Sequence, residues 1–429
     1  MRIVVVGSGA GGATAARELV LKGHDVFVLE AGRPFKPLSR RVRWVEPLRW
    51  TGVLGTERTI DKISSHIRTT RSSRDLVLVR GVTTGGTTTI SCGNMVRAEN
   101  GLKEIGLDLV QEFGEIEDMI GVAPIPRDRW RPATRKMFDG AEKMGLRPSP
   151  TPKAVDAEKC VACGLCEVGC ATGAKWDSRR FLADFIANGG KIQTESKVRK
   201  VIVEKNRAAG VLVARGQSSE VVHADAVILA AGGIGTAEIL RSSDLPVSDT
   251  LWADIVLTMG GQLEGARQLE EAPMVWYAKR DDYIISPYID ILSHWFHKPW
   301  RGVSMEDRVG VMVKLADVAN GRVDAEGRVT KEVTARDRER LDEGLSLARS
   351  IMETAGVKGP FVEGMLNGGH LGGTVPLAKG DVPLMRPSTL PEDLWVADLS
   401  LVPKSQGLPT MLTAAAISLR VARIVVERR

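Results

Sequence analysis

A glycine-rich turn close to the start of the chain is the feature that most constrains its fold. Residues 2–6 form an apolar, β-branched run typical of a buried parallel strand. A helix is expected to follow, ending at Gly23, and the turn between strand and helix has the spacing G-x-G-x-x-G, at Gly7, Gly9 and Gly12. The first glycine of this spacing allows a tight turn, the second lets backbone approach a diphosphate, and the third lets the helix pack against the strand. The spacing predicts a nucleotide site in an α/β fold, and a glycine-rich turn without a ligand is the disfavoured alternative.

The next strand is expected over residues 25–30 and ends on an acid, Glu30. A carboxylate at this place binds ribose hydroxyls, while the diphosphate meets the positive end of the helix dipole. Two later segments favour FAD over NAD. Residues 226–232 form an apolar strand that ends in a small-residue turn, and residues 80–89 form a second loop rich in Gly and Thr, suited to wrap a ribityl chain or a flavin ring.

At this point the chain resembles the glucose–methanol–choline (GMC) family of flavoproteins, and it is similar in particular to the short members grouped with long-chain alcohol oxidases. Five blocks carry the resemblance, at residues 7–32, 80–97, 160–176, 226–243 and 368–416. The resemblance implies a Rossmann-like FAD-binding domain of GMC type, a second α+β substrate domain and a small cysteine-rich insertion. In addition to the three glycines and Glu30, it places the following residues around FAD: Ser8, Ala31, Gly32, Gly81, Gly85, Gly86, Thr87, Thr88, Asn94, Val198, Ala231, Gly232, Asp398 and Thr410.

The candidate catalytic base is His370. Oxidation of an alcohol through a flavin needs a group that takes the hydroxyl proton, and histidine is the usual choice near neutral pH. His370 lies in the block G-H-L-G-G-T, where the family has its catalytic histidine; a packed core or capping histidine is the alternative. The family's second catalytic group would fall on Pro409, so it is absent or displaced. Ser91, Asn94 and Asn367 are candidate substitutes, between which the sequence does not choose.

Four of the five cysteines lie within eleven residues, at Cys160, Cys163, Cys166 and Cys170. The spacing C-x2-C-x2-C-x3-C is that of a ferredoxin, although Ala171 stands where a proline usually follows. A 4Fe–4S cluster is the favoured interpretation, and zinc or a metal-free loop are the alternatives. Clustered thiols also indicate a reducing compartment, so a cytoplasmic protein is expected.

The remaining composition excludes several classes of protein. The 429 residues are 43% hydrophobic and 26% charged, as in ordinary globular proteins, and the net charge of +6 is too diluted by acids to indicate nucleic acid. No uncharged run is long enough to span a membrane. Residues 33–80 carry twelve basic and four acidic residues, which predicts either a solvated loop or a docking site for an acidic partner. Seven aromatic residues within 276–300 predict a substrate roof or partner face, or equally a strand core.

The expected organisation is a discontinuous FAD-binding domain, a helical and cysteine-rich insertion over 101–189 with its cluster loop at 158–172, and a substrate or partner domain over 251–365. The FAD-binding domain takes residues 1–100, 190–250 and 366–429. The expected function is an FAD- and iron–sulfur-dependent oxidoreductase that dehydrogenates an alcohol or hydroxy compound. Electrons would pass singly through the cluster to a ferredoxin-like protein or a partner subunit. The alternative is an electron-transfer subunit of a larger complex with no alcohol substrate, and an NAD dehydrogenase explains the sequence poorly.

Overall fold

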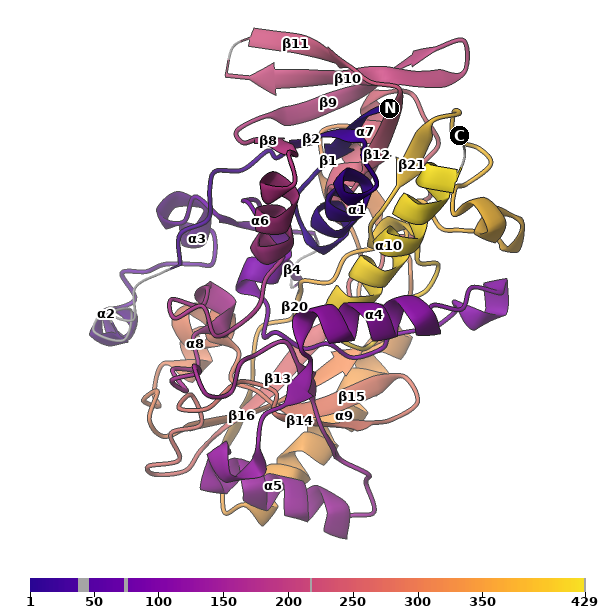
Figure 1. Ribbon diagram of the computed structural model, residues 1–429. Helices are drawn as coiled ribbons and strands as arrows, with labels where there is room; N and C mark the ends of the chain where they lie inside the picture. The colour runs from indigo at the N-terminus through magenta and orange to yellow at the C-terminus, as the bar shows by residue number, and fades with distance from the viewer. Residues whose placement is uncertain (38–45, 73–75, 217, 428–429) are drawn as a thin grey trace.

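The computed structural model describes residues 1–37, 46–72, 76–216 and 218–427, and the upper half of the molecule in Figure 1 is built on a parallel sheet. Its five strands run in the order β21-β12-β1-β2-β8, so the first strand of the chain lies at the centre. Val4 of the central strand pairs with Val227 on one side and Phe27 on the other. The strands are β1 (Arg2–Val6), β2 (Asp25–Leu29), β8 (Lys191–Gln193), β12 (Ala226–Leu229) and β21 (Leu394–Val396).

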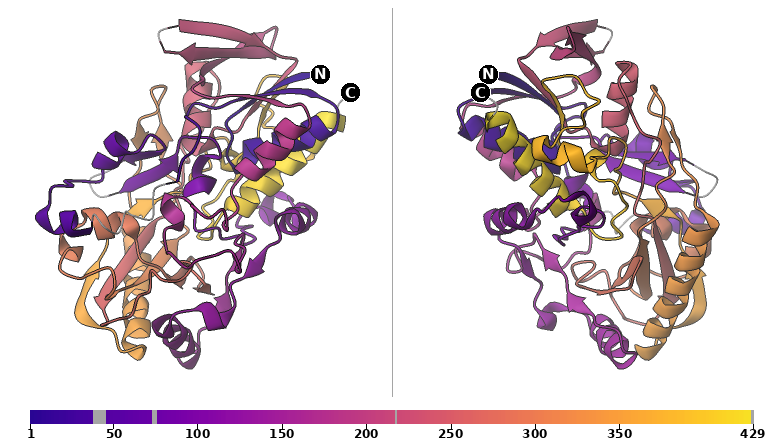
Figure 2. Two further views of the ribbon diagram at one scale, coloured as in Figure 1. Left: turned by 60° about the vertical axis from the view of Figure 1, so that its left-hand side comes forward. Right: turned by 90° about the vertical axis from the view of Figure 1, so that its right-hand side faces the viewer.

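Helices cover one face of this sheet and a small antiparallel sheet lies against the other. The helices α6, α1 and α10 lie side by side, with α4 packed on α10 (Figures 1 and 2). The small sheet, in the order β11-β10-β9, packs against β12 and the helix α7. These elements are α1 (Ala10–Leu21), α4 (Val110–Ile120), α6 (Arg179–Ala187), α7 (Gly232–Ser242), α10 (Met411–Glu427), β9 (Lys197–Glu204), β10 (Arg207–Arg215) and β11 (Ser218–His223).

The lower half of the molecule contains a mostly antiparallel sheet in the order β3-β4-β20-β13-β16-β15-β14-β6, with β19 also paired to β13. Early and late parts of the chain meet here, because β4 pairs in parallel with β20. The strands are β3 (Ile67–Arg71), β4 (Val77–Gly81), β6 (Ser149–Pro150), β13 (Val256–Gln262), β14 (Trp276–Lys279), β15 (Tyr283–Pro287), β16 (Arg308–Leu315), β19 (Lys358–Glu363) and β20 (Asn367–Gly368).

The helix α9 (Ala335–Thr354) covers the second sheet. Thr334 accepts from the backbone N–H of Asp337 and the Asp337 carboxylate accepts from the N–H of Thr334, which completes a capping box. The helix ends before Gly356, which has a φ of +87°. The other elements are α2 (Glu46–Thr51), α3 (Thr59–Ile63), α5 (Pro132–Lys143), α8 (Ile291–Phe296), β5 (Ala123–Pro124), β7 (Pro152–Lys153), β17 (Arg322–Val323) and β18 (Val329–Thr330).

The structure confirms the α/β class and the strand–turn–helix unit at the start of the chain, with α1 beginning at Ala10. Within the described ranges, none of the helices has the length and apolar character that crossing a membrane requires. The basic segment 33–80 lies partly outside the described residues, since Arg40, Arg41, Arg43 and Arg74 are not among them.

Candidate functional site

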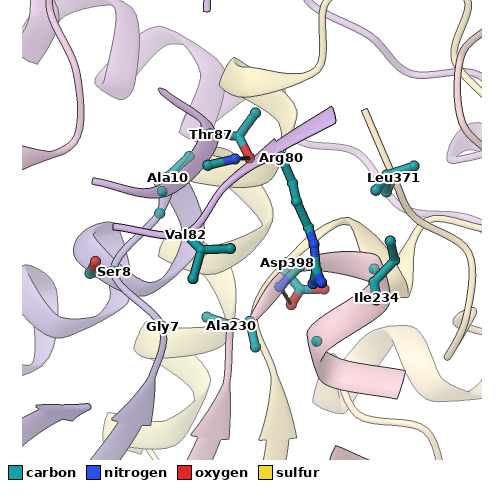
Figure 3. Close-up of a pocket in the computed structure, with 18 of the residues that line it drawn as sticks. Gly7, Ser8, Ala10, Arg80, Val82, Thr87, Ala230, Ile234, Leu371 and Asp398 are labelled. Atoms are coloured by element: carbon teal, nitrogen blue, oxygen red, sulfur yellow. Dashed lines mark hydrogen bonds between the residues drawn. The ribbon is translucent and has the colours of Figure 1, made fainter. Parts of the chain in front are cut away.

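A cavity of about 450 Å³ opens where the parallel strands β1, β2 and β12 end, at the edge where open α/β sheets bind nucleotides (Figure 3). Most of the residues expected around FAD line it: Gly7, Ser8, Gly9, Glu30, Ala31, Gly81, Gly86, Thr87, Thr88, Val198, Ala231, Gly232, Asp398 and Thr410. The first turn of α1 and the Gly/Thr-rich loop therefore face one another across a single space, although about 80 residues separate them in sequence.

The three glycines of the first turn have three different roles. Gly7 has a φ of +100°, and a Cβ there would lie 2.4 Å from the carbonyl oxygen of Ala230. A Cβ on Gly12 would lie 2.0 Å from the carbonyl oxygen of Gly7, so this glycine lets helix and strand pack. A Cβ on Gly9 would meet only the Cα of Gly86, at 4.0 Å, and would otherwise point into open cavity. Gly9 is thus the position that keeps space for a ligand.

Glu30 is buried at the end of β2 and holds the turn by hydrogen bonds. Its Oε2 accepts from the Ser8 hydroxyl at 2.6 Å, and its Oε1 accepts from the Gly32 N–H at 2.8 Å. Burial raises the pKa of Glu30, although these hydrogen bonds act in the other direction. No lysine or arginine lies within ion-pair distance of it among the described residues. A buried carboxylate without a cation is a strong acceptor for hydroxyl donors such as those of a ribose.

Four expected cofactor residues do not line this cavity: Gly12, Gly32, Gly85 and Asn94. Gly32 supports Glu30, and a Cβ there would lie 2.1 Å from the carbonyl oxygen of Val82. The N–H of Gly85 donates to the Ser8 hydroxyl at 3.1 Å, which ties the second loop to the first turn. Asn94 lines a neighbouring cavity instead.

Asp398 closes the end of the cavity near α7 and α10. One of its carboxylate oxygens accepts from the N–H of Gly232 at 2.8 Å and from the Thr236 hydroxyl at 2.6 Å, which joins the turn after β12 to the loop after β21. Burial raises its pKa. Thr410 and Met411 bring the start of α10 to the cavity wall, so the positive end of this helix dipole faces the cavity.

Three cationic side chains also line the cavity, Arg68, Arg80 and Lys197, and the sequence analysis assigned none of them to the cofactor site. Lys197 is paired with Glu238, at 2.6 Å. The Arg80 side chain extends from β4 across the cavity toward Asp398 (Figure 3), and its buried Nε has no hydrogen-bond partner within the described part of the chain. An orphaned guanidinium N–H in a cavity of this kind fits an anionic ligand. Arg80 directly precedes the expected loop glycine Gly81, and this position was the signal in the sequence. Three features therefore fit FAD: the open space at Gly9, the Glu30 carboxylate without a cation partner, and the Arg80 guanidinium with a free N–H.

A second cavity, of about 210 Å³, adjoins the first. Its wall is mostly apolar, with polar groups from Ser91, Cys92, Asn94, Glu167, Asp290, Lys314, Asn367 and His370. The two cavities share five wall residues, which are Thr87, Ser91, Gly369, His370 and Met411. His370 thus borders both the cavity that fits FAD and a separate space of small-molecule size.

His370 is held by a buried acid and a buried lysine that the sequence analysis did not single out. Its Nδ1 lies 3.4 Å from Oδ2 of Asp254, and Nζ of Lys314 lies 3.1 Å from the same oxygen. Burial lowers the pKa of His370 and the positive charge of Lys314 lowers it further, while Asp254 opposes them. Burial alone would raise the pKa of Asp254, but Lys314 and the hydrogen bonds bring it to about 2. This arrangement keeps His370 neutral and Asp254 ionised.

Asp254 is fixed by its loop as well as by these side chains. Its Oδ1 accepts from the N–H groups of Gln406 and Gly407, each at 2.8 Å, and from the Ser405 hydroxyl at 2.7 Å. Its backbone φ is +48°, in the left-handed region that residues other than glycine adopt infrequently. The signal in the sequence is Lys314 itself, a lysine in the otherwise apolar run at 309–315, every residue of which is buried.

Pro409 lines the second cavity, and it offers no group that could carry a proton. The three candidate substitutes line the same cavity, and each makes polar contacts within the protein. The Ser91 hydroxyl donates to the carbonyl oxygen of Thr88, and the Asn367 amide donates to Asp290 and to the carbonyl oxygen of Met365. The Asn94 amide nitrogen contacts Met274, and its oxygen accepts from Lys153.

The aromatic cluster at 276–300 has two parts. Tyr288 and Phe296 line the second cavity, and the Tyr288 hydroxyl donates to Glu167 at 2.5 Å. Trp276, Tyr283 and Trp300 are buried in the core. Part of this segment therefore forms core, and the role of Tyr288 and Phe296 as a substrate roof stays a prediction.

The cysteine loop contacts the second cavity through Glu167 and Val168. All five cysteines are free thiols, and within the described ranges no three histidine, cysteine or acidic side chains come together as metal ligands. Cys160, Cys163, Cys166 and Cys170 therefore do not form the ligand set of a 4Fe–4S cluster in this structure.

Comparisons with known proteins agree with this geometry. The model of the family "GMC oxidoreductase" matches residues 1–256, and the model "FAD binding domain" matches residues 176–339. The chain is 26% identical to an uncharacterized protein of Methanocaldococcus jannaschii over 98% of both chains. It is 32% identical to an uncharacterized GMC-type oxidoreductase of Mycobacterium tuberculosis over 281 residues, which are 61% of this chain and 42% of the relative. A long-chain-alcohol oxidase of Arabidopsis thaliana is 27% identical over 57% of this chain and 34% of its own.

Among solved structures, the fold is similar to that of pyridoxine 4-oxidase from Mesorbium loti. The TM-score is 0.74 at 16% sequence identity, and the superposition covers 100% of this chain and 99% of the other. The chain spans less than half the length of the Mycobacterium and Arabidopsis relatives. The match to the family model over more than half of the chain, with a cavity that fits FAD, shows that this protein belongs to the GMC oxidoreductase family of FAD-dependent enzymes.

Proposed function

We propose that the protein oxidises the hydroxyl group of a compact alcohol to a carbonyl group, with FAD as the oxidant. The observation that carries the proposal is the position of His370 in the wall shared by the two cavities. A substrate in the 210 Å³ cavity would place its carbinol carbon next to the FAD cavity and its hydroxyl next to His370. Similar proteins named for oxidation of long-chain alcohols and of pyridoxine support the class of reaction.

FAD, when bound, supplies a two-electron acceptor for the hydride of the carbinol carbon. The protein itself carries out the other step, in which the O–H bond of the substrate breaks and the proton moves to His370. Because Nδ1 faces Asp254, Nε2 is the nitrogen left for the substrate. A neutral histidine is a competent base, and the ionised Asp254 stabilises the imidazolium that forms.

The test is anaerobic reduction of the bound flavin by a panel of alcohols, monitored as loss of the visible absorbance of the flavin. At least one small alcohol is expected to bleach the flavin, and His370→Ala is expected to keep FAD bound but to reduce the bleaching rate by about 10²–10⁴-fold. Bleaching of the His370→Ala flavin at the wild-type rate removes His370 from the mechanism. Reduction only by a protein donor, and by none of the alcohols, supports the alternative of an electron-transfer subunit.

We further propose, from the spacing of the cysteines, that the loop at 158–172 binds a 4Fe–4S cluster that passes electrons to a protein acceptor in the cytoplasm. One structural observation supports an anionic centre here. Lys153 and Lys175 are buried beside the loop, and neither has a carboxylate within ion-pair distance among the described residues. Lys175 donates to the carbonyl oxygen of Cys166, at 3.0 Å. Buried cations of this kind are stabilised by thiolates.

Iron and acid-labile sulfide in anaerobically purified protein test this second proposal. About four irons per chain, lost in Cys163→Ser, support the cluster. A redox-silent zinc or an iron-free, fully active protein overturns it, and the second outcome leaves a simple flavin enzyme.

A further inference from the structure

Lys314 has a hydrogen-bond donor that no group of the described chain accepts. Its side chain comes from β16, is 3% exposed and lines the second cavity together with His370. Nζ donates to Asp254 twice, to Oδ2 at 3.1 Å and to the backbone carbonyl oxygen at 3.3 Å. An ammonium group has three N–H donors, so one remains.

A second buried lysine shows what a purely structural one looks like in this fold. Lys331 is fully buried and forms a comparable ion pair with Asp317, at 2.7 Å. Its other two donors reach the carbonyl oxygen of Val318 at 2.8 Å and Oδ1 of Asn320 at 2.9 Å. All three donors are used, and Lys331 lines neither cavity. The two lysines therefore differ in their third N–H and in their access to the cavity.

We propose that Lys314 is a catalytic residue, and that its free N–H donates to the oxygen of the substrate while His370 takes the proton from that oxygen. This inference rests on the proposed alcohol oxidation. Lys314 and His370 contact the same Oδ2 of Asp254, so base and donor converge on one region of the cavity wall. Pro409 offers no donor there, and the Ser91 hydroxyl and the Asn367 amide donate to protein groups. The Asn94 amide nitrogen contacts the sulfur of Met274.

The charges of this cluster explain why a lysine can act here. The two lysines balance Asp254 and Asp317, so the cluster is neutral while His370 is neutral. When the hydroxyl proton moves to His370, negative charge develops on the substrate oxygen, and Lys314 is already in place to stabilise it. The charged groups that face His370 are Lys314 and Asp254, and of these only Lys314 lines the cavity.

The experiment compares Lys314→Met with Lys331→Met in the flavin-loaded enzyme. The readouts are bound FAD, thermal unfolding and the rate of anaerobic flavin reduction by a saturating alcohol that reduces the wild type. Loss of one such donor is expected to lower the rate by about 10²–10³-fold in Lys314→Met. The rate of flavin reduction in Lys331→Met, per bound flavin, is expected to stay within about threefold of the wild-type rate. Loss of this lysine leaves the buried carboxylate of Asp317 without its cation, which lowers stability but does not change the chemical step.

Two further readouts separate a catalytic role from a structural one. Removing the charge of Lys314 is expected to move the acidic limb of the pH–rate profile to higher pH, because this charge lowers the pKa of His370. The primary deuterium isotope effect on flavin reduction is expected to be as large in these variants as in the wild type. Lys314→Gln retains a neutral hydrogen-bond donor. It is expected to show the same pH shift with a smaller loss of rate than Lys314→Met. It also provides the test if Lys314→Met does not fold.

Equal losses in Lys314→Met and Lys331→Met overturn the inference, as does a wild-type rate with an unmoved pH profile in Lys314→Gln. If no alcohol reduces the wild-type flavin, the proposed function itself fails. If alcohols reduce the flavins of wild type and Lys314→Met equally fast, the proposed function stands and only the role of Lys314 falls.

Discussion

Asp254 and His370 meet through a 3.4 Å contact between Oδ2 and Nδ1, next to the wall that separates the two cavities. The contact fixes the ring of the histidine and leaves Nε2 as its other reactive atom. It also joins Asp254 to the G-H-L-G-G-T block, which lies more than a hundred residues later in the chain. The reactivity of the site depends on this long-range pairing.

The first prediction concerns pH. Because burial and Lys314 lower the pKa of His370, the histidine is neutral, and able to accept a proton, down to a pH below its ordinary value of 6.5. The value of kcat/KM is therefore expected to rise with pH to a plateau, with its acidic midpoint below 6.5. Anaerobic flavin reduction across the range from acidic to neutral pH measures it, with FAD content checked at each pH. A midpoint above the ordinary histidine value would contradict the neutral state of His370.

The second prediction separates ligand space from packing within the first turn. Gly9→Ala is expected to fold with the stability of the wild type but to lose FAD, because its Cβ points into open cavity. Gly12→Ala is expected to lose at least about 1–3 kcal/mol of stability, since its Cβ would lie 2.0 Å from the carbonyl oxygen of Gly7.

Gly114→Ala in α4 is the matched control, because a Cβ added at this glycine would have no atom within 4 Å. It is expected to be neutral or slightly stabilising and to keep its FAD. Thermal unfolding of the apoproteins and flavin titration give the two readouts. Normal FAD binding by Gly9→Ala would remove this turn from the cofactor site.

Local signals in the sequence were enough to predict the nucleotide half of the site. Gly7, Gly9 and Glu30 lie within one strand–helix–strand unit, whose geometry follows from a short stretch of chain. The capping box of Thr334 and Asp337 is local in the same way. Such features need no knowledge of the distant chain, and the structure confirms the strand–helix–strand unit.

The catalytic side depends on contacts that no local pattern contains. Asp254 lies in a loop, and only tertiary packing brings it to Lys314, 60 residues later, and to His370, 116 residues later. The pairing of Lys331 with Asp317 is likewise not predictable from the local sequence. A buried lysine in an apolar strand indicates that a partner exists, but it does not indicate which acid the fold supplies.

The third prediction concerns the ribose. Glu30→Gln is expected to weaken FAD binding by about tenfold or more, since hydrogen bonds to a charged acceptor contribute about 1.5–3 kcal/mol. Glu271→Gln is the matched control. Glu271 is also buried with its pKa raised by burial, to about 8, but it lies outside both cavities and accepts from Thr134 and from the Arg131 N–H. Flavin titration of the two apoproteins is expected to show a loss of affinity in the first variant alone.

The fourth prediction concerns the diphosphate. The unpartnered Nε of Arg80 is expected to bind an anionic part of FAD, so Arg80→Met is expected to weaken FAD binding by at least about tenfold and to make the remaining affinity less dependent on salt. Arg180→Met on α6 is the control, because this arginine is exposed and lies outside both cavities. Equal salt dependence of FAD binding in Arg80→Met and wild type would place Arg80 away from the phosphates.

The last prediction concerns substrate size. The second cavity, at about 210 Å³, is smaller than the roughly 300–1,000 Å³ typical of sites for drug-sized ligands, and carboxyl groups of Glu167 and Asp290 stand in its wall. Compact alcohols with a second polar group are therefore expected to reduce the flavin with a higher kcat/KM than long aliphatic alcohols, whose chains offer these carboxyl groups no hydrogen-bond donor. Phe296→Ala widens the cavity and is expected to raise the relative kcat/KM of bulkier alcohols, whereas Phe361→Ala, outside the cavity, is expected to leave the ratio unchanged. A wild-type enzyme that prefers long-chain alcohols would contradict this prediction. It would show that the cavity is larger when substrate is bound, and that Phe296 and α8 do not limit its size.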